Sequence, residues 1–317
     1  MVIIVLILLE LSFIMDKRKQ GIALFITLTV IASIMSIIAV SFTYLEKVQK
    51  DAGITSAILQ GNLLHKNTVS ILKKFFPQGK DNNEKLKIIY ENPLPLNEPK
   101  SGFGLMLSCK PLLIGVPISW LDKSLFPKTP TKMVLASEVL TLVMERYDIQ
   151  EPNELEELIM KAVTGKVSQN EDNVPRIRSK RGIVSKSQFN RIISDYRLRF
   201  DDPKVLLVPW ERYFSFTKVG KETKIDGMYL TPEFISVAFD VPIEIVQDSW
   251  IVGESTLQSF LTENSIVAPI DKKIYSNKAL NAMHCEETYA YRDGQYKINF
   301  DYIEERSGNF EFNGKTE

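Results

Sequence analysis

The longest uninterrupted apolar stretch of the chain lies near its N-terminus. Residues 22–42 read IALFITLTVIASIMSIIAVSF, which is 21 residues without a charge, a proline or a glycine. As an α-helix this run would measure roughly 30 Å, the thickness of the hydrocarbon core of a bilayer. A helix that is apolar on every face lies either in a deep core or in lipid, and the position near the terminus favours lipid. The pattern therefore predicts a transmembrane helix.

Helical spacing continues beyond this run. Between Tyr44 and Phe76 apolar residues recur at roughly helical intervals with polar residues between them, and no proline interrupts the pattern. The sequence Pro77-Gln78-Gly79 ends it. We predict a single helix over residues 22–76, with its first half in lipid and its second half packed against a soluble domain.

The charges that flank the apolar run are asymmetric. Residues 16–19 (DKRK) carry three positive charges, whereas residues 46–51 carry two acids and two lysines. The positive-inside rule then places the N-terminus in the cytoplasm and everything after Phe42 outside. Residues 1–14 are apolar and precede the basic cluster. They are either a second short membrane segment or the product of a start-site error, in which case Met15 begins a leader that ends at Gly21.

Residues 80–130 contain short apolar segments separated by turns. Leu86–Tyr90 is a strand candidate, and prolines break the chain directly after it. Residues 104–107 and 112–116 are further apolar runs, each too short to assign to a helix. We predict that 80–130 forms the first part of an α/β domain.

Residues 131–260 return to helical periodicity. Pro152 opens one helix that Gly165 closes, and Ser185 and Thr231 are N-terminal caps of two others. These signals predict an inserted helical domain of four or five short helices.

The last segment, 261–317, alternates between apolar and polar positions. Residues 288–292 and 295–302 flank Asp293-Gly294, a preferred two-residue hairpin turn, and Phe310 and Phe312 continue the alternation. We therefore predict a three-stranded antiparallel meander as the closing strands, and an α+β fold for the whole chain.

Composition gives little sign of a charged partner. The 317 residues include 39 basic and 39 acidic side chains, so the formal net charge is zero and no nucleic-acid partner is expected. A basic run at Arg176, Arg178, Lys180, Arg181 and Lys186 lacks interleaved aromatic residues and is interpreted as a solvated loop.

Candidate chemistry is sparse. His284-Cys285-Glu286-Glu287 is a possible metal or nucleophile cluster, but adjacent residues on a strand point to opposite faces and do not easily share one ion. The chain has no nucleophile elbow, phosphate-binding loop or His-Glu-x-x-His motif. We therefore expect a protein that is not an enzyme.

The segment around Gly21 resembles a known processing site. Lys17-Arg18-Lys19-Gln20-Gly21, followed by Ile22-Ala23-Leu24 and the apolar run, is similar to the start of type IV pilins and pseudopilins. In that family a prepilin peptidase cuts after the glycine, so the resemblance implies cleavage between Gly21 and Ile22.

One departure from the family pattern narrows the resemblance. The family usually has phenylalanine first and glutamate fifth after the cut, whereas this chain has Ile22 and Ile26. A carboxylate in a bilayer needs a partner, thought to be the amino terminus of a neighbouring subunit, and a subunit at the tip has no such neighbour. The chain thus resembles the K-type minor pseudopilins of type II secretion, which lack this glutamate, and Ile26 would specify the tip position.

The resemblance implies an architecture, a location and partners. A pilin-like antiparallel sheet would be interrupted by an all-α insertion domain, on a single-pass inner-membrane anchor with the C-terminal domain in the periplasm. The implied partners are I-type and J-type minor pseudopilins, the major pseudopilin, prepilin peptidase and inner-membrane lipid. Two alternatives remain open: a DNA-uptake pseudopilus component, and an inner-membrane-anchored periplasmic binding protein or enzyme whose anchor is incidental.

Two further expectations concern the soluble part. Cys109 and Cys285 flank the helical insertion in an oxidising compartment, so we predict a disulfide between them, with two independent buried thiols as the alternative. K-type relatives bind calcium, which prefers six to eight oxygen ligands. Acidic candidates form no recognisable loop, and the resemblance assigns no ligand among them; they include Asp201, Asp202, Glu222 and Asp226.

Overall fold

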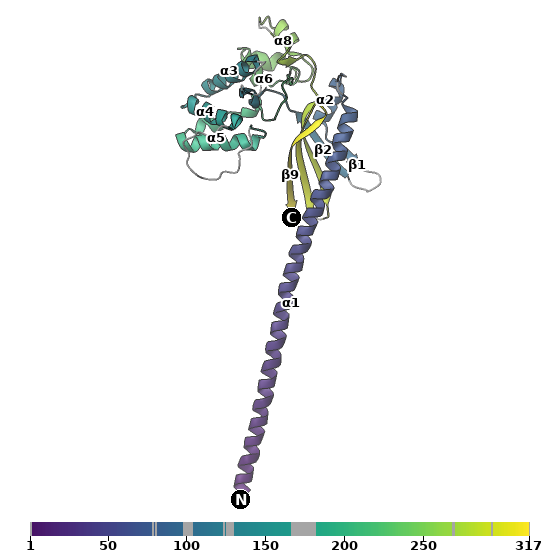
Figure 1. The fold of residues 1–317 in the computed structure, drawn as a ribbon, viewed down its shortest axis with the longest axis vertical. Coiled ribbons are helices and arrows are strands. Elements are labelled where there is room, and N and C mark those ends of the chain that lie inside the picture. The colour runs from purple at the N-terminus through teal and green to yellow at the C-terminus, as the bar shows by residue number, and fades with distance from the viewer. Residues whose placement is uncertain are drawn as a thin grey trace. The chain divides into compact units, whose positions relative to one another are not determined.

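The computed structural model describes residues 2–77, 79, 81–97, 104–122, 124, 130–165, 182–267, 270–292 and 294–316, with side chains described between residues 25 and 314. These residues form two compact units, Met1–Gln60 and Gly61–Glu317. The fold is α+β, as predicted: a long N-terminal apolar helix, an antiparallel sheet and a set of shorter helices (Figure 1).

Helix α1 runs from Val2 to Phe75 as one element. The helix predicted over 22–76 is therefore present, and its backbone continues upstream through the residues around Met15. The end is close to the predicted one, because the amide of Phe76 still donates to the carbonyl of Leu72 at 2.8 Å before Pro77 follows.

The main sheet has five antiparallel strands in the order β1-β2-β7-β8-β9. The strands are β1 Leu94–Asn97, β2 Gly104–Pro111, β7 Ala282–Tyr291, β8 Gly294–Ile303 and β9 Arg306–Thr316. The predicted meander is confirmed, since β7, β8 and β9 are consecutive neighbours and Tyr291 pairs with Gly294 across the hairpin. Strand β2 precedes the helical segment in sequence, yet it pairs with β7, which follows that segment.

One sequence prediction is wrong. The segment Leu86–Tyr90, expected to be a strand, lies within helix α2, Asn83–Glu91. Leu86 and Ile89 are buried three residues apart on one face of this helix, which packs beside β2. The local pattern of this short apolar run fits a strand as well as a helix, and the packing of its buried face in the folded protein selects the helix. Strand β1 follows α2 and lies at the edge of the sheet. Proline is tolerated there at position 95, because an edge strand forms hydrogen bonds with a neighbouring strand on one side only.

Between β2 and β7 the chain is mainly helical. The α-helices are α3 Pro130–Arg146, α4 Pro152–Thr164, α5 Lys186–Phe200, α6 Pro232–Ala238, α7 Ile243–Ser249 and α8 Leu257–Glu263. Short 3-10 turns lie at η1 Ile118–Leu121, η2 Pro203–Leu206 and η3 Trp210–Arg212. Two small parallel pairs join β3 Val116–Pro117 to β4 Phe214–Ser215 and β5 Ile225–Asp226 to β6 Tyr275–Ser276.

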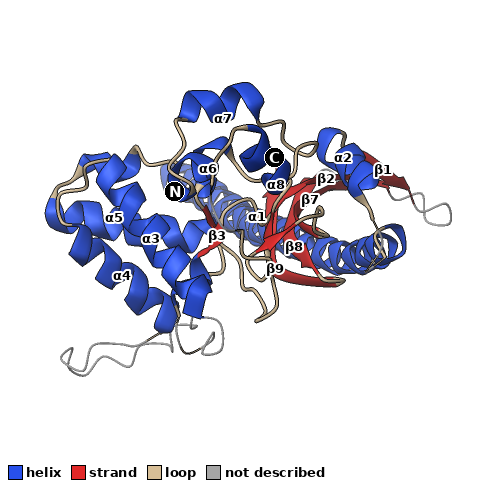
Figure 2. Ribbon diagram, turned by 90° about the horizontal axis from the view of Figure 1, so that it is seen from above, coloured by secondary structure: helices blue, strands red, loops and turns tan. Residues whose placement is uncertain are grey.

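The helix boundaries follow the predicted caps. The hydroxyls of Ser185 and Thr231 accept hydrogen bonds from the amides of Gln188 and Phe234, at 3.3 and 3.2 Å. Gly165 ends α4 in the left-handed conformation that glycine adopts without strain. Figure 2 shows α3, α4 and α5 side by side, and their buried faces share one apolar core that includes Trp120, Leu155 and Phe189.

Candidate functional site

The apolar part of α1 carries its side chains outward. Between Phe25 and Phe42 all residues of the first unit are exposed, including Ile26 at 56%. Of the helices that the structure describes, this one alone is long and apolar enough to cross a membrane, judged by length and composition. Its polar side chains are satisfied within the helix: Thr29, Ser33 and Ser36 each donate to the carbonyl four residues earlier at 2.8 Å. A helix in lipid requires such internal satisfaction.

The proposed processing site lies upstream of this region. Gly21 and Ile22 belong to the part of α1 whose side chains lie outside the described residues. Cleavage there stays a prediction.

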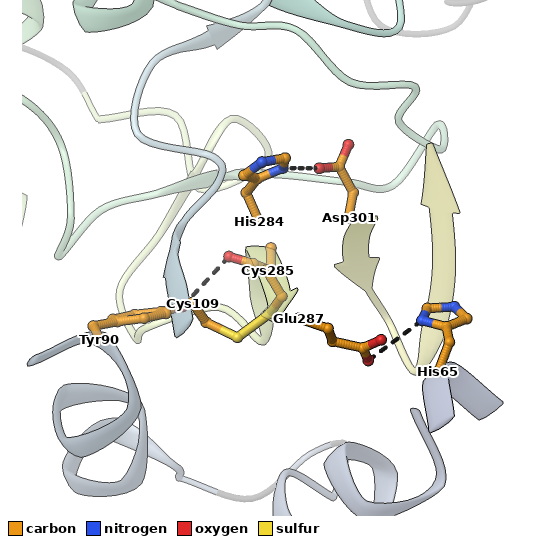
Figure 3. The surroundings of a disulfide bond; sticks show 8 residues. His65, Tyr90, Cys109, His284, Cys285, Glu287 and Asp301 are labelled. Atoms are coloured by element: carbon orange, nitrogen blue, oxygen red, sulfur yellow. Dashed lines mark hydrogen bonds and ion pairs between the residues drawn. A yellow bond between two sulfur atoms is a disulfide. The ribbon is translucent and has the colours of Figure 1, made fainter. Parts of the chain in front are cut away.

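The two cysteines are joined by a disulfide. Cys109 on β2 and Cys285 on β7 are directly paired in register, with Cα atoms 4.1 Å apart and an S–S distance of 2.06 Å (Figure 3). Both side chains are buried. The bridge closes a sequence separation of 176 and joins the strand that enters the helical segment to the strand that leaves it. It therefore fixes the two ends of that segment to each other.

The sheet face that carries the disulfide packs against the last turns of α1, residues 61–75. Tyr289 and Ile298 lie against Gly61, where a Cβ atom would come within 2.3 Å of the Tyr289 hydroxyl oxygen. Only glycine allows this approach. Further along the helix, His65 lies over the same face beside Phe300, with ring centroids 4.5 Å apart, and beside the fully buried Glu287.

The opposite sheet face carries a second polar cluster. The imidazole Nδ1 of His284 lies 2.7 Å from a carboxylate oxygen of Asp301, which is almost fully buried (Figure 3). The second oxygen of Asp301 accepts from the Thr217 hydroxyl at 2.7 Å and from the Asn309 amide at 2.5 Å. The hydrogen bond to Asp301 raises the pKa of His284, against the smaller effect of burial. One carboxylate thus joins β7, β8 and β9 to Thr217, which lies between β4 and β5 in the middle of the helical segment.

This polar cluster lies in a cleft of about 280 Å³ between the sheet and the start of α5. Lys186, in the first turn of α5, forms an ion pair of 3.0 Å with Glu211 at the same cleft. The remainder of the predicted basic run, residues 176–181, lies outside the described residues.

The structure separates the four residues of the His284–Glu287 sequence cluster. Cys285 and Glu287 are buried on the α1 face, while His284 and Glu286 lie on the opposite face. In the described parts of the chain no group of three or more His, Cys, Asp or Glu side chains is arranged to hold a metal ion.

The acidic residues considered for calcium do not form a ligand set. The carboxylate of Asp202 accepts from the backbone amides of Gln150 and Lys204, both at 3.0 Å. That of Asp226 accepts from Met228 at 3.0 Å and Leu280 at 2.7 Å. Asp201 and Glu222 are exposed. Two of the four carboxylates are thus already used by backbone donors, so these residues do not fit a calcium ion.

Three polar contacts of buried side chains were not predicted from the sequence: Thr217 with Asp301, His65 with Glu287, and Lys132 with the carbonyls of Lys221 and Thr223. Their sequence separations are large, and no local motif marks them.

The comparisons with known proteins support the fold. No family model and no curated protein matches the sequence. A chain in the crystal structure of the GspK-GspI-GspJ complex from the enterotoxigenic Escherichia coli type 2 secretion system is similar in structure, with a TM-score of 0.55 and 10% sequence identity. The match covers 86% of this chain and 100% of that chain. A likeness at this identity concerns the backbone arrangement, and it shows that this chain has a pseudopilin-like fold.

Proposed function

We propose that the protein is a non-enzymatic K-type minor pseudopilin, located at the tip of a type II secretion pseudopilus. The observation that carries the proposal is the fold likeness to a chain of the GspK-GspI-GspJ complex over that chain's full length. The apolar, outward-facing helix around Ile26 supports it independently, because it provides the membrane anchor that such a subunit needs.

The proposed action is mechanical. A prepilin peptidase removes the leader after Gly21, and the helix beginning at Ile22 remains in the inner membrane with the C-terminal domain in the periplasm. Lateral packing with I-type and J-type partners nucleates a tip complex, and major subunits then add below it. The mainly helical segment between β2 and β7 corresponds to the expected insertion, although it is not all-α, because it also contains the pairs β3–β4 and β5–β6. In this proposal its bulk prevents another subunit from stacking above.

Two measurements test this proposal. Mass spectrometry of the protein isolated from its own membranes is expected to find a mature chain that begins at Ile22. Replacing Gly21 by leucine is expected to leave the leader attached, whereas Gly53→Ala, in the same helix, leaves processing unchanged. A mature chain that begins at another residue would overturn the pseudopilin assignment.

The system that the protein serves is tested separately. Deletion of its gene is expected to abolish protein export and to leave DNA uptake intact. Loss of transformation with normal export would assign the chain to a DNA-uptake pseudopilus instead.

A further inference from the structure

Helix α3 buries a lysine that has no acidic partner at ion-pair distance within the described residues. The side chain of Lys132 is 1% exposed. Its ammonium donates to the backbone carbonyls of Lys221 and Thr223, both at 2.8 Å, and lies 4.8 Å from the ring centroid of Trp120. A dehydrated cation is thus held by two carbonyl oxygens and one aromatic face.

Burial also affects the protonation of Lys132. It lowers the pKa of the Lys132 ammonium, although the more distant carboxylates of Glu222 and Asp271 act in the opposite direction. A charge that is retained under this penalty must be compensated by its contacts, because an uncompensated ammonium in an apolar interior is costly.

These contacts match an ammonium ion and not a divalent metal. An ammonium has three N–H donors and interacts favourably with an aromatic face, so two carbonyls and Trp120 satisfy it. Calcium requires six to eight oxygens, and an indole ring supplies none.

The segment that the cation holds is the connection 217–224 between β4 and β5. Within it the amide of Gly220 donates to the Thr223 hydroxyl at 3.0 Å. At its start Thr217 donates to Asp301 of β8. Lys132 therefore connects α3 to a loop that itself contacts the sheet.

We propose that Lys132 is a built-in cation that organises loop 217–224 in place of a metal ion. The loop then requires no divalent cation, and truncation of the lysine leaves a binding site for a small organic ammonium ion. This proposal concerns the folded soluble part and does not depend on the role in secretion.

The experiment uses the full chain in detergent micelles and follows hydrogen exchange of the backbone amides in 217–224. Exchange in the unaltered protein is expected to be the same in EDTA and in calcium chloride. Lys132→Met fills the volume without the charge, and we expect exchange in the loop to rise on the order of tenfold, because two backbone carbonyls of the loop lose their donor. Lys221→Ala is the matched control, since its exposed side chain is removed while the carbonyl that accepts from Lys132 stays.

The binding site is tested with Lys132→Ala. Removal of the side chain beyond Cβ leaves a space that fits n-propylammonium, so this ion is expected to restore slow exchange, whereas sodium chloride or tetramethylammonium at equal ionic strength is not. Faster exchange of the unaltered protein in EDTA, or wild-type protection in Lys132→Met, would overturn the proposal. Absence of rescue in a folded Lys132→Ala variant would overturn the ammonium site, and if that variant fails to fold, the EDTA and Lys132→Met measurements decide.

Discussion

His65 and Glu287 are polar neighbours across the contact between α1 and β7, with 3.5 Å between the imidazole Nδ1 and a carboxyl oxygen. Glu287 is fully buried, and neither of its oxygens has a hydrogen-bond donor among the described residues. The other imidazole nitrogen, Nε2, lies 3.3 Å from the hydroxyl of Ser307 on β9. The side chain of His65 therefore connects the last turns of α1 to two strands of the sheet, through Glu287 on β7 and Ser307 on β9.

Breaking this pair on one side is expected to be costly. His65→Leu leaves the buried Glu287 carboxyl without its nearest polar side chain, and the free energy of unfolding should fall by about 1–3 kcal/mol. Replacing both residues by leucine should recover most of this loss, because no buried polar group is then left without a partner. Denaturant unfolding of the three proteins measures the effect, with Lys66→Ala on the exposed side of the helix as control. Equal destabilisation by the double and the single replacement would contradict this account.

The disulfide is expected to supply a large part of the stability of the sheet. By the chain-entropy model, closing a loop of this length contributes about 5 kcal/mol. Cys109→Ala/Cys285→Ala should lower the melting temperature and lose all response to a reducing agent, whereas the unaltered protein should destabilise on reduction. An unaltered melting temperature in the double variant would show that sheet pairing alone holds the two ends of the helical segment together.

Asp226 is expected to make stability depend on pH. Burial raises the pKa of Asp226 to about 7, although backbone amides of Leu280 and Met228 oppose the shift. The pKa in the unfolded chain is about 3.9. The stabilising contribution of the protonated form is therefore complete below about pH 4 and is lost as pH rises through 7.

The matched variant for this effect is Asp226→Asn, which cannot ionise. The stability of the unaltered protein relative to this variant should fall by as much as about 4 kcal/mol between pH 4 and pH 8. Unfolding free energies of both proteins across this range measure the difference. A difference that does not change with pH would mean that the backbone donors stabilise the carboxylate enough to offset its burial.

The contact between His284 and Asp301 is also expected to make stability depend on pH. Because Asp301 raises its pKa, the contribution of the His284–Asp301 contact is complete below about pH 6.5 and is lost as pH rises through the folded-state pKa. The side chain is half-exposed, so the effect on stability should be modest. NMR titration resolves it directly, since the chain has only two histidines. Asp301→Asn should lower the titration midpoint of His284; an unmoved His284 midpoint would contradict the assigned cause.

Ile26 is expected to distinguish a tip subunit from a shaft subunit. Ile26→Glu places a carboxylate in the bilayer at a cost on the order of 2.5–3.5 kcal/mol unless a neighbour's amino group pairs with it. For a tip subunit the variant should insert and be processed, yet gain nothing in assembly. Site-specific crosslinking along isolated pseudopili measures its position. Improved incorporation along the fibre would place the chain in the shaft.

The sequence by itself determined the elements whose signal is local. The charge-free run 22–42 specifies a helix that suits lipid, the caps at Ser185 and Thr231 specify where helices begin, and Asp293-Gly294 specifies the hairpin between β7 and β8. Each depends on residues a few positions apart, so propensity, capping and turn geometry suffice.

Tertiary structure alone decided what depends on distant partners. Leu86–Tyr90 became a helix because Leu86 and Ile89 face the core together, and the run is too short for its own pattern to choose. His65 meets Glu287, and Lys132 meets the carbonyl of Thr223, across many residues of intervening chain. The stability of such contacts comes from burial, which removes water as the competing partner, and burial exists only once the sheet and the helices have packed.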